Sequence, residues 1–134
     1  MSKLTASQLA DYIDHTLLKP EATAQQIDQL CDKAQPWGFY SVCVDLFWLP
    51  RVAKRMADAK TPVKIDITVA YPTGAIPTAR KVAQVRWALD HGADEIDMVV
   101  NIGALCDGQE QLVLDDIAAL AEAVHSDSAD KLLK

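Results

Sequence analysis

Alternation of apolar and polar residues predicts several short β-strands along the chain. Residues 39–45 (FYSVCVD), 63–71 (VKIDITVAY) and 95–102 (EIDMVVNI) combine this alternation with many β-branched and aromatic side chains, as strands usually do. The segment 12–16 (YIDHT) fits either a strand or an extended loop. Residues 131–134 (KLLK) are expected to begin a further strand.

Apolar residues between these strands recur with the period of an α-helix. Thr23 and Gln26 form a capping-box pattern ahead of one such stripe, and Pro36 with Gly38 is expected to end that helix. Three more helices are expected over about 50–59, 78–91 and 109–125. Strands that alternate with helices of this length predict a parallel sheet with right-handed connections.

Every predicted strand has one apolar face and one face of small or polar residues. In 95–102, for example, Ile96 and Met98 alternate with Glu95 and Asp97. A doubly wound sheet, which is covered by helices on both faces, would be apolar on both. The pattern therefore favours an α/β fold with helices on one side only and a polar interior, as in a β/α barrel, whose strands carry catalytic groups at their C-terminal ends. Four side chains from successive strands are expected to point into this interior: Asp14, Cys43, Thr68 and Asp97.

Asp97 is the most informative of these residues, because an ionised carboxylate is almost never buried without a partner. A structural ion pair, for instance with Lys64 on a neighbouring strand, is the alternative to a catalytic role. Asp14 could instead cap a turn, and Cys43 could be a small buried apolar residue. A metal site made of Asp14, His15 and Asp97 is not favoured, since adjacent residues of a strand point to opposite faces.

Composition narrows the possible function classes. A net charge of −6 and a pI of about 4.9 argue against non-specific binding to nucleic acid or to an anionic membrane. No apolar run approaches the roughly 20 residues of a membrane helix, and the first residues lack the apolar segment of a signal peptide, so a cytoplasmic location is expected. Three widely spaced cysteines fit reduced thiols. The length of 134 residues predicts one domain over 1–134.

Three blocks of the sequence closely resemble the deoxyribose-phosphate aldolases. They are IDHTLLKP (13–20), SVCVD (41–45) and GADEIDMVVNIGAL (92–105), and the resemblance extends over essentially the whole chain. It implies a (β/α)₈ TIM barrel and a class I aldolase that needs no metal or organic cofactor. Such an enzyme reversibly joins acetaldehyde to D-glyceraldehyde 3-phosphate, giving 2-deoxy-D-ribose 5-phosphate through a Schiff base on a lysine.

The same resemblance implies roles for individual residues. Asp97 and Asp14 correspond to the catalytic aspartates that relay a proton, while Thr16 and Cys43 correspond to residues that line the substrate pocket. Two segments depart from the family pattern near the rim of that pocket. Asp45–Leu46 replaces the usual Asn-Pro, and residues 70–74 (AYPTG) replace a turn of the Gly-Phe-Pro-Leu-Gly type. These departures affect the expected aldehyde preference.

Length is the largest departure from the family. A (β/α)₈ barrel takes roughly 250 residues, so 134 residues should form an incomplete barrel of about four βα units that ends near the start of strand five. The Schiff-base lysine of the family would then be absent, and Lys19, Lys64 and Lys134 are poor substitutes. The chain is therefore expected to be inactive alone, either as a fragment or as the product of a shortened gene.

An incomplete barrel would also expose unpaired strand edges. Self-association or binding of a complementary half-barrel is therefore expected. The alternative to an aldolase chain is a non-catalytic half-barrel that serves as an assembly or binding module.

Overall fold

Five parallel strands form a single curved sheet in the computed structural model, which describes residues 3–134. Their order in the sheet follows their order in the chain, as in the wall of a β/α barrel. The predicted parallel sheet is confirmed, and the segment that fitted either a strand or an extended loop forms a strand. The strands are β1 (Asp14–Leu17), β2 (Ser41–Asp45), β3 (Lys64–Val69), β4 (Glu95–Met98) and β5 (Leu132–Leu133).

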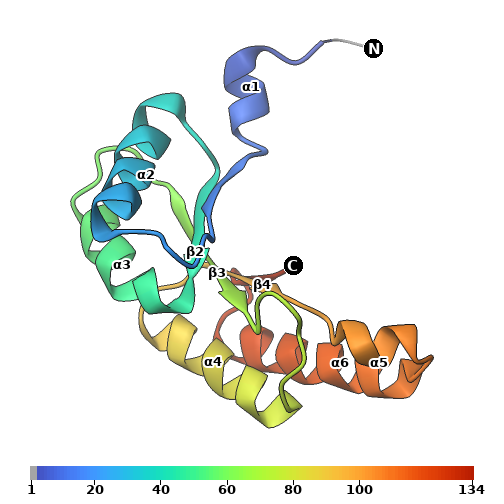
Figure 1. Ribbon diagram of the computed structural model, residues 1–134. Helices are drawn as coiled ribbons and strands as arrows, with labels where there is room; N and C mark the ends of the chain where they lie inside the picture. The colour runs from blue at the N-terminus through green and yellow to red at the C-terminus, as the bar shows by residue number, and fades with distance from the viewer. Residues whose placement is uncertain (1–2) are drawn as a thin grey trace.

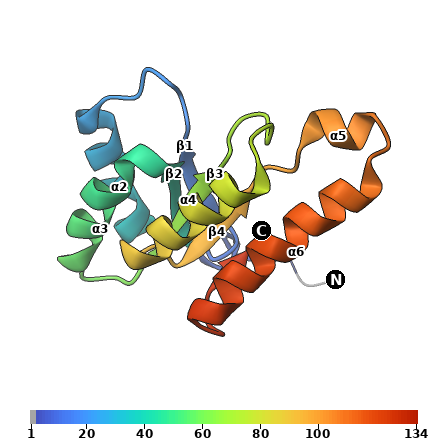
Figure 2. The same ribbon diagram turned by 90° about the horizontal axis from the view of Figure 1, so that it is seen from below.

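Helices cover one side of this sheet (Figures 1 and 2). The four that connect successive strands are α2 (Ala24–Trp37), α3 (Leu49–Ala57), α4 (Thr78–Asp90) and α6 (Glu110–Asp127). The apolar face of the strands packs against them and forms the core, which includes Val42, Ile67 and Ile96. The expected division into an apolar outer face and a polar inner face is therefore confirmed.

No helix within residues 3–134 is both long and apolar enough to cross a bilayer.

Two short helices were not expected from the sequence. One is α1 (Ala6–Ala10), which begins at a capping box formed by Thr5 and Gln8. The other is α5 (Ile102–Cys106), where the side chain of Asn101 accepts a hydrogen bond from the backbone of Ala104 at 3.1 Å. This cap explains why β4 ends at Met98 and not at residue 102.

The helix α2 ends at Gly38 and the strand β2 at Asp45, as expected, but the local structure at both ends has features that the sequence did not predict. Pro36 lies inside α2, and the helix ends only where Gly38 adopts a left-handed backbone conformation with φ of 64°. A short 3₁₀ helix, η1 (Leu46–Trp48), follows β2 directly, because the Asp45 carboxylate accepts a hydrogen bond from the Phe47 backbone at 3.0 Å. Asp45 thus has a local structural role where the family pattern has asparagine.

A buried ion pair joins α4 to α6. Lys81 and Asp116 are both buried and form a salt bridge, and the Lys81 ammonium also donates to the Val99 carbonyl at 2.9 Å. The pair therefore connects the outer helices to the segment that follows β4. Gly74, in the loop after β3, contacts the same segment, since a Cβ at this position would lie 2.0 Å from the Val100 carbonyl oxygen.

Candidate active site

The inner face of the sheet carries a row of carboxylates. Asp66 in β3 lies beside Cys43 in β2 and beside Glu95 in β4, and one step further along the strands Thr68 lies beside Asp97. Asp14 in β1 completes the set from the edge of the sheet. Because parallel strands place every second side chain on the same face, four short strands are sufficient to gather these acids.

One part of this row is neutralised by Lys134, whose side chain points into the barrel interior. Its ammonium lies 2.8 Å from Asp14 Oδ2, 3.4 Å from Asp66 Oδ2 and 2.5 Å from Glu95 Oε2. Burial by itself lowers the pKa of Lys134, but hydrogen bonds to Asp14 and Glu95 outweigh it and hold that pKa above the ordinary value. Lys134 is therefore protonated at neutral pH and is a poor nucleophile.

Two hydroxyl groups complete the contacts of these acids. Ser41 Oγ donates to Asp14 Oδ1 at 2.6 Å, and the Tyr40 hydroxyl donates to Glu95 Oε1 at 2.7 Å. Burial raises the pKa of Asp14, but the hydrogen bonds from Lys134 and Ser41 lower it by more, so Asp14 is ionised at neutral pH. Tyr40 precedes β2, and its hydroxyl reaches the polar interior.

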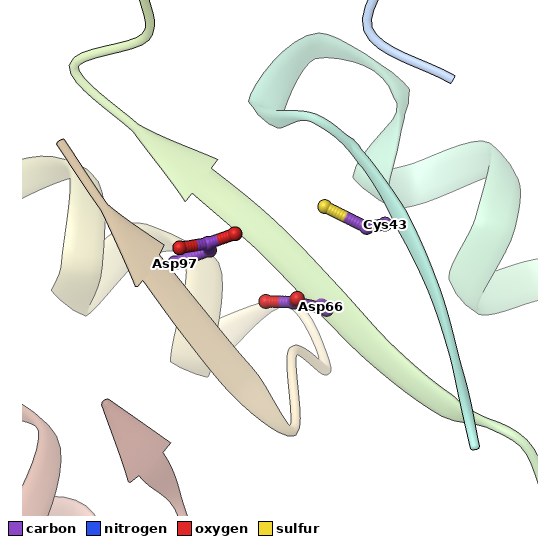
Figure 3. A group of neighbouring side chains, drawn as sticks. All are labelled: Cys43, Asp66 and Asp97. Atoms are coloured by element: carbon purple, nitrogen blue, oxygen red, sulfur yellow. The ribbon is translucent and has the colours of Figure 1, made fainter. Parts of the chain in front are cut away.

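A second group of side chains consists of Cys43, Asp66 and Asp97, from three adjacent strands (Figure 3). One donor atom from each lies within 4.8 Å of the other two. Cys43 and Asp66 are buried, whereas Asp97 is partly open to solvent. Asp66 Oδ1 is buried and has no hydrogen-bond partner among residues 3–134.

All three groups have raised pKa values. Burial, reinforced by the charges of Asp97 and Asp14 and opposed by Lys134, raises the pKa of Asp66 to about 6. Burial also raises the pKa of Asp97, and Lys134 opposes this effect. Burial raises the pKa of the Cys43 thiol well above its usual range, so the thiol is protonated at neutral pH. A carboxyl group whose pKa is moved toward neutrality can both accept and return a proton.

The structure places the predicted site residues on the inner face of the sheet, but they do not all contact one another. Asp14 and Asp97 lie in neighbouring groups that share Asp66. Thr16 lies beside Cys43 in the register, with its hydroxyl donating to the Asp14 carbonyl at 3.0 Å. The four proposed site residues thus surround one stretch of the inner face.

The alternatives to a catalytic site are tested by the same geometry. Lys64 lies 3.9 Å from Asp94 and forms no ion pair with Asp97, so the ion pair suggested for Lys64 and Asp97 is not present. His15 packs against the Phe39 ring, with 4.8 Å between ring centroids, on the opposite face of β1 from Asp14. This arrangement agrees with the argument against a metal site that includes His15.

Sequence analysis did not select three of the residues that shape the site. Asp66 and Glu95 fall on the predicted polar faces of their strands, so period-2 alternation contained the signal for both. Lys134 could not be assigned in this way, because β5 is only two residues long and provides too little pattern.

Two hollows lie at the C-terminal ends of the first three strands. One, of about 660 Å³, is lined by residues that include Lys19, Phe47 and Tyr71. The adjoining one, of about 590 Å³, shares Phe47 and Tyr71 and extends to Thr68 and Trp87. The segments that depart from the family pattern, 45–46 and 70–72, contribute to these walls. Aromatic side chains therefore form part of the surface that an entering molecule would meet.

Comparison with known proteins gives a consistent result. The sequence model of the DeoC/LacD family aldolases matches residues 9–130. The deoxyribose-phosphate aldolase of Thermococcus gammatolerans is 43% identical over 126 residues, which is 94% of this chain and 56% of that protein. Deoxyribose-phosphate aldolase 1 of Staphylococcus aureus is 45% identical over 123 residues, or 92% of this chain and 55% of that protein.

The fold comparison agrees with the sequence comparison. A crystal structure of a Coccidioides immitis protein assigned to the deoxyribose-phosphate aldolases superposes with a TM-score of 0.88 and 32% identity, covering 99% of this chain and 50% of the other. The chain therefore has the fold of the first part of a β/α barrel, as predicted, and it spans about half the length of the relatives it matches.

Proposed function

The chain belongs to the DeoC/LacD aldolase family, and on this premise we propose that it contributes the proton-relay half of a deoxyribose-phosphate aldolase site. The reaction is the reversible addition of acetaldehyde to D-glyceraldehyde 3-phosphate, which gives 2-deoxy-D-ribose 5-phosphate through a lysine Schiff base. A cytoplasmic location fits these small, phosphorylated substrates.

The observation that carries this proposal is the position of Asp97. Its carboxyl is partly open to solvent and has a pKa raised by burial, and it lies beside the buried pair Cys43 and Asp66. Such a group can take a proton from the carbon next to an iminium ion and later return it. Asp14, held ionised by Lys134 and Ser41, favours positive charge nearby. We further expect Cys43 and Thr16, which lie beside each other in the register of the strands, to line the substrate pocket of the complete site.

We expect the Schiff-base lysine to come from outside these 134 residues. Lys134 is bound by three carboxylates, and Lys81 is buried against Asp116. Lys134 is held in the protonated form, which is not nucleophilic, and the buried Lys81 is out of reach of an aldehyde.

A complementary half-barrel is the expected partner. The edges of β1 and β5 each pair with one neighbour only, and an unpaired edge is a template for a further strand. A non-catalytic assembly module, which the same open edges favour, is the second candidate function.

Reconstitution distinguishes the two candidates. The 134-residue chain would be mixed with the separately produced C-terminal half of the Thermococcus gammatolerans aldolase, and cleavage of 2-deoxy-D-ribose 5-phosphate would be followed by acetaldehyde release. We expect turnover from the mixture and none from either half alone.

The variants Asp97→Asn and Asp90→Asn form a matched pair for this assay. Asp97→Asn should lower the rate by about 10²- to 10⁴-fold, the usual contribution of a general acid–base group. Asp90 is exposed at the end of α4, and Asp90→Asn should leave the rate unchanged. Halves that bind each other without turnover would favour the assembly module.

A further inference from the structure

We propose that Cys43, Asp66 and Asp97 form a binding site for one divalent transition-metal ion of borderline softness, of which Zn²⁺ is the representative. The inference goes beyond the aldol reaction proposed above, which uses no metal, and an ion bound to Asp97 would compete with the proton transfer proposed for that residue. It rests on three observations: the placement of the donor atoms, an unpartnered buried oxygen and the balance of charge.

The donor atoms come from three adjacent strands that hold them on one face. Figure 3 shows the Cys43 thiol and the Asp97 carboxylate directed toward each other across β3, the strand that carries Asp66. One donor atom from each residue lies within 4.8 Å of the other two. Zinc bonds of about 2.0–2.3 Å in a tetrahedral site place the donors roughly 3.5 Å apart. Small rotations of the side chains would therefore bring all three into coordination.

Asp66 provides independent support for a ligand at this place. Its side chain is fully buried, and Oδ2 is 3.4 Å from Lys134, whereas Oδ1 has no hydrogen-bond partner among residues 3–134. A buried carboxylate oxygen without a partner costs free energy. Thr68 Oγ1, two residues further along the same face, is a second buried oxygen without a partner in the described chain. A bound cation would satisfy Asp66 Oδ1 directly.

The group of Cys43, Asp66 and Asp97 differs in its charge balance from the neighbouring group of acids around Lys134. The carboxylates of Asp14, Asp66 and Glu95 surround the Lys134 ammonium, so that group already contains a cation. Within residues 3–134, Asp97 forms no ion pair. The inner face thus has more negative than positive groups around Asp97, and a dication would compensate them. The partly exposed Asp97 leaves a route for the ion to enter.

The donor set selects the class of metal. Mg²⁺ and Ca²⁺ prefer oxygen ligands alone, whereas a thiolate together with carboxylates suits Zn²⁺ or Co²⁺. Binding forms a metal–sulfur bond, and the thiol proton leaves to solvent while the metal keeps its oxidation state. A solvent oxygen can take the fourth position of a tetrahedral site.

Titration with Co²⁺ tests the proposal, since cobalt reports a bound thiolate through a charge-transfer band in the near ultraviolet. The full 134-residue chain, freed of metal by a chelator and then of the chelator, would be titrated with Co²⁺ and afterwards with Zn²⁺. We expect the band to saturate at one Co²⁺ per chain and to disappear as Zn²⁺ displaces the cobalt. No band in the unsubstituted chain would overturn the proposal.

Matched variants identify the ligands. Cys43→Ser should abolish the band, whereas Cys106→Ser, which removes an exposed free thiol, should leave it unchanged. Asp66→Asn and Asp97→Asn should each weaken Co²⁺ binding by about tenfold or more, and circular dichroism would verify that each variant is folded. If Asp66→Asn does not fold, Asp97→Asn provides the same test. A band that survives Cys43→Ser, or is lost in Cys106→Ser, would contradict the assignment. The assay contains no aldehyde, so its result is independent of the proposed aldolase function.

Discussion

The ammonium of Lys134 lies 2.8 Å from the carboxylate of Asp14, so an ion pair joins residues 120 positions apart in the chain. Asp14 begins β1 and Lys134 follows β5, and these strands form the two edges of the sheet. Neighbouring strands are spaced by roughly 4.8 Å, so edge strands four positions apart in a flat sheet would be about 19 Å from each other. The contact therefore depends on the strong curvature of a barrel wall.

Replacing Lys134 should destabilise the fold. Lys134→Met leaves Asp14, Asp66 and Glu95 facing one another without a cation, and uncompensated charges in a partly buried site cost about 2 to 4 kcal/mol. Urea denaturation at neutral pH would measure the loss. Lys60→Met, at an exposed position, is the matched control and should change the free energy of unfolding by less than about 0.5 kcal/mol. Equal effects of the two substitutions would show that the ion-pair network contributes nothing.

Stability should depend on pH through Asp66. Its pKa rises from the ordinary 3.8 to about 6 in the fold, so the folded state favours the protonated form. This contribution is fully present below pH 3.8 and is lost as the pH rises through 6. A difference of about two in pKa corresponds to roughly 3 kcal/mol.

Unfolding free energies measured with chelator between about pH 4 and pH 7 would test this dependence. The unsubstituted chain should lose more stability over this range than Asp66→Asn, in which the position cannot titrate. Asp90→Asn should follow the unsubstituted chain. Parallel curves for Asp66→Asn and the unsubstituted chain would exclude the raised pKa.

The buried pair of Lys81 and Asp116 should show strong coupling. Lys81→Met or Asp116→Leu alone leaves one buried charge unpaired, at a cost of about 3 to 5 kcal/mol. The double substitution should recover most of this loss, because it removes both charges. A double-mutant cycle by urea denaturation gives the coupling free energy, and strictly additive losses would refute the pairing.

Gly74 should be far less tolerant of a side chain than Gly108. Both have positive φ, 65° and 72°, but a Cβ at Gly74 would meet the Val100 carbonyl at 2.0 Å, whereas nothing lies within 4 Å of a Cβ at Gly108. Gly108→Ala therefore measures the cost of the backbone conformation alone. Gly74→Ala should cost an additional 1 to 3 kcal/mol or so, measured by thermal unfolding. Similar melting temperatures would mean that the loop can move away from Val100.

The alternation of residues in the strands predicted much of the inner face, but not its contacts. Asp97 and Cys43 could be placed on the polar side because every second residue of a strand shares a face. The connection between Asp14 and Lys134 could not be predicted, since it depends on how far five strands curve. The early end of β4 at Met98 could not be predicted either, because the alternation of residues does not show that the Asn101 side chain caps a helix.

The contact between Lys81 and the Val99 carbonyl crosses from the outer layer to the inner one. Lys81 belongs to α4 in the outer layer, yet the carbonyl it holds is only two residues beyond Asp97. A change in the way α4 and α6 pack would tilt the end of β4 and with it the angle of the acid. In the proposed aldolase site, selection on catalytic rate would therefore also act on this helix interface, and screens of the reconstituted enzyme for altered turnover should find beneficial substitutions there.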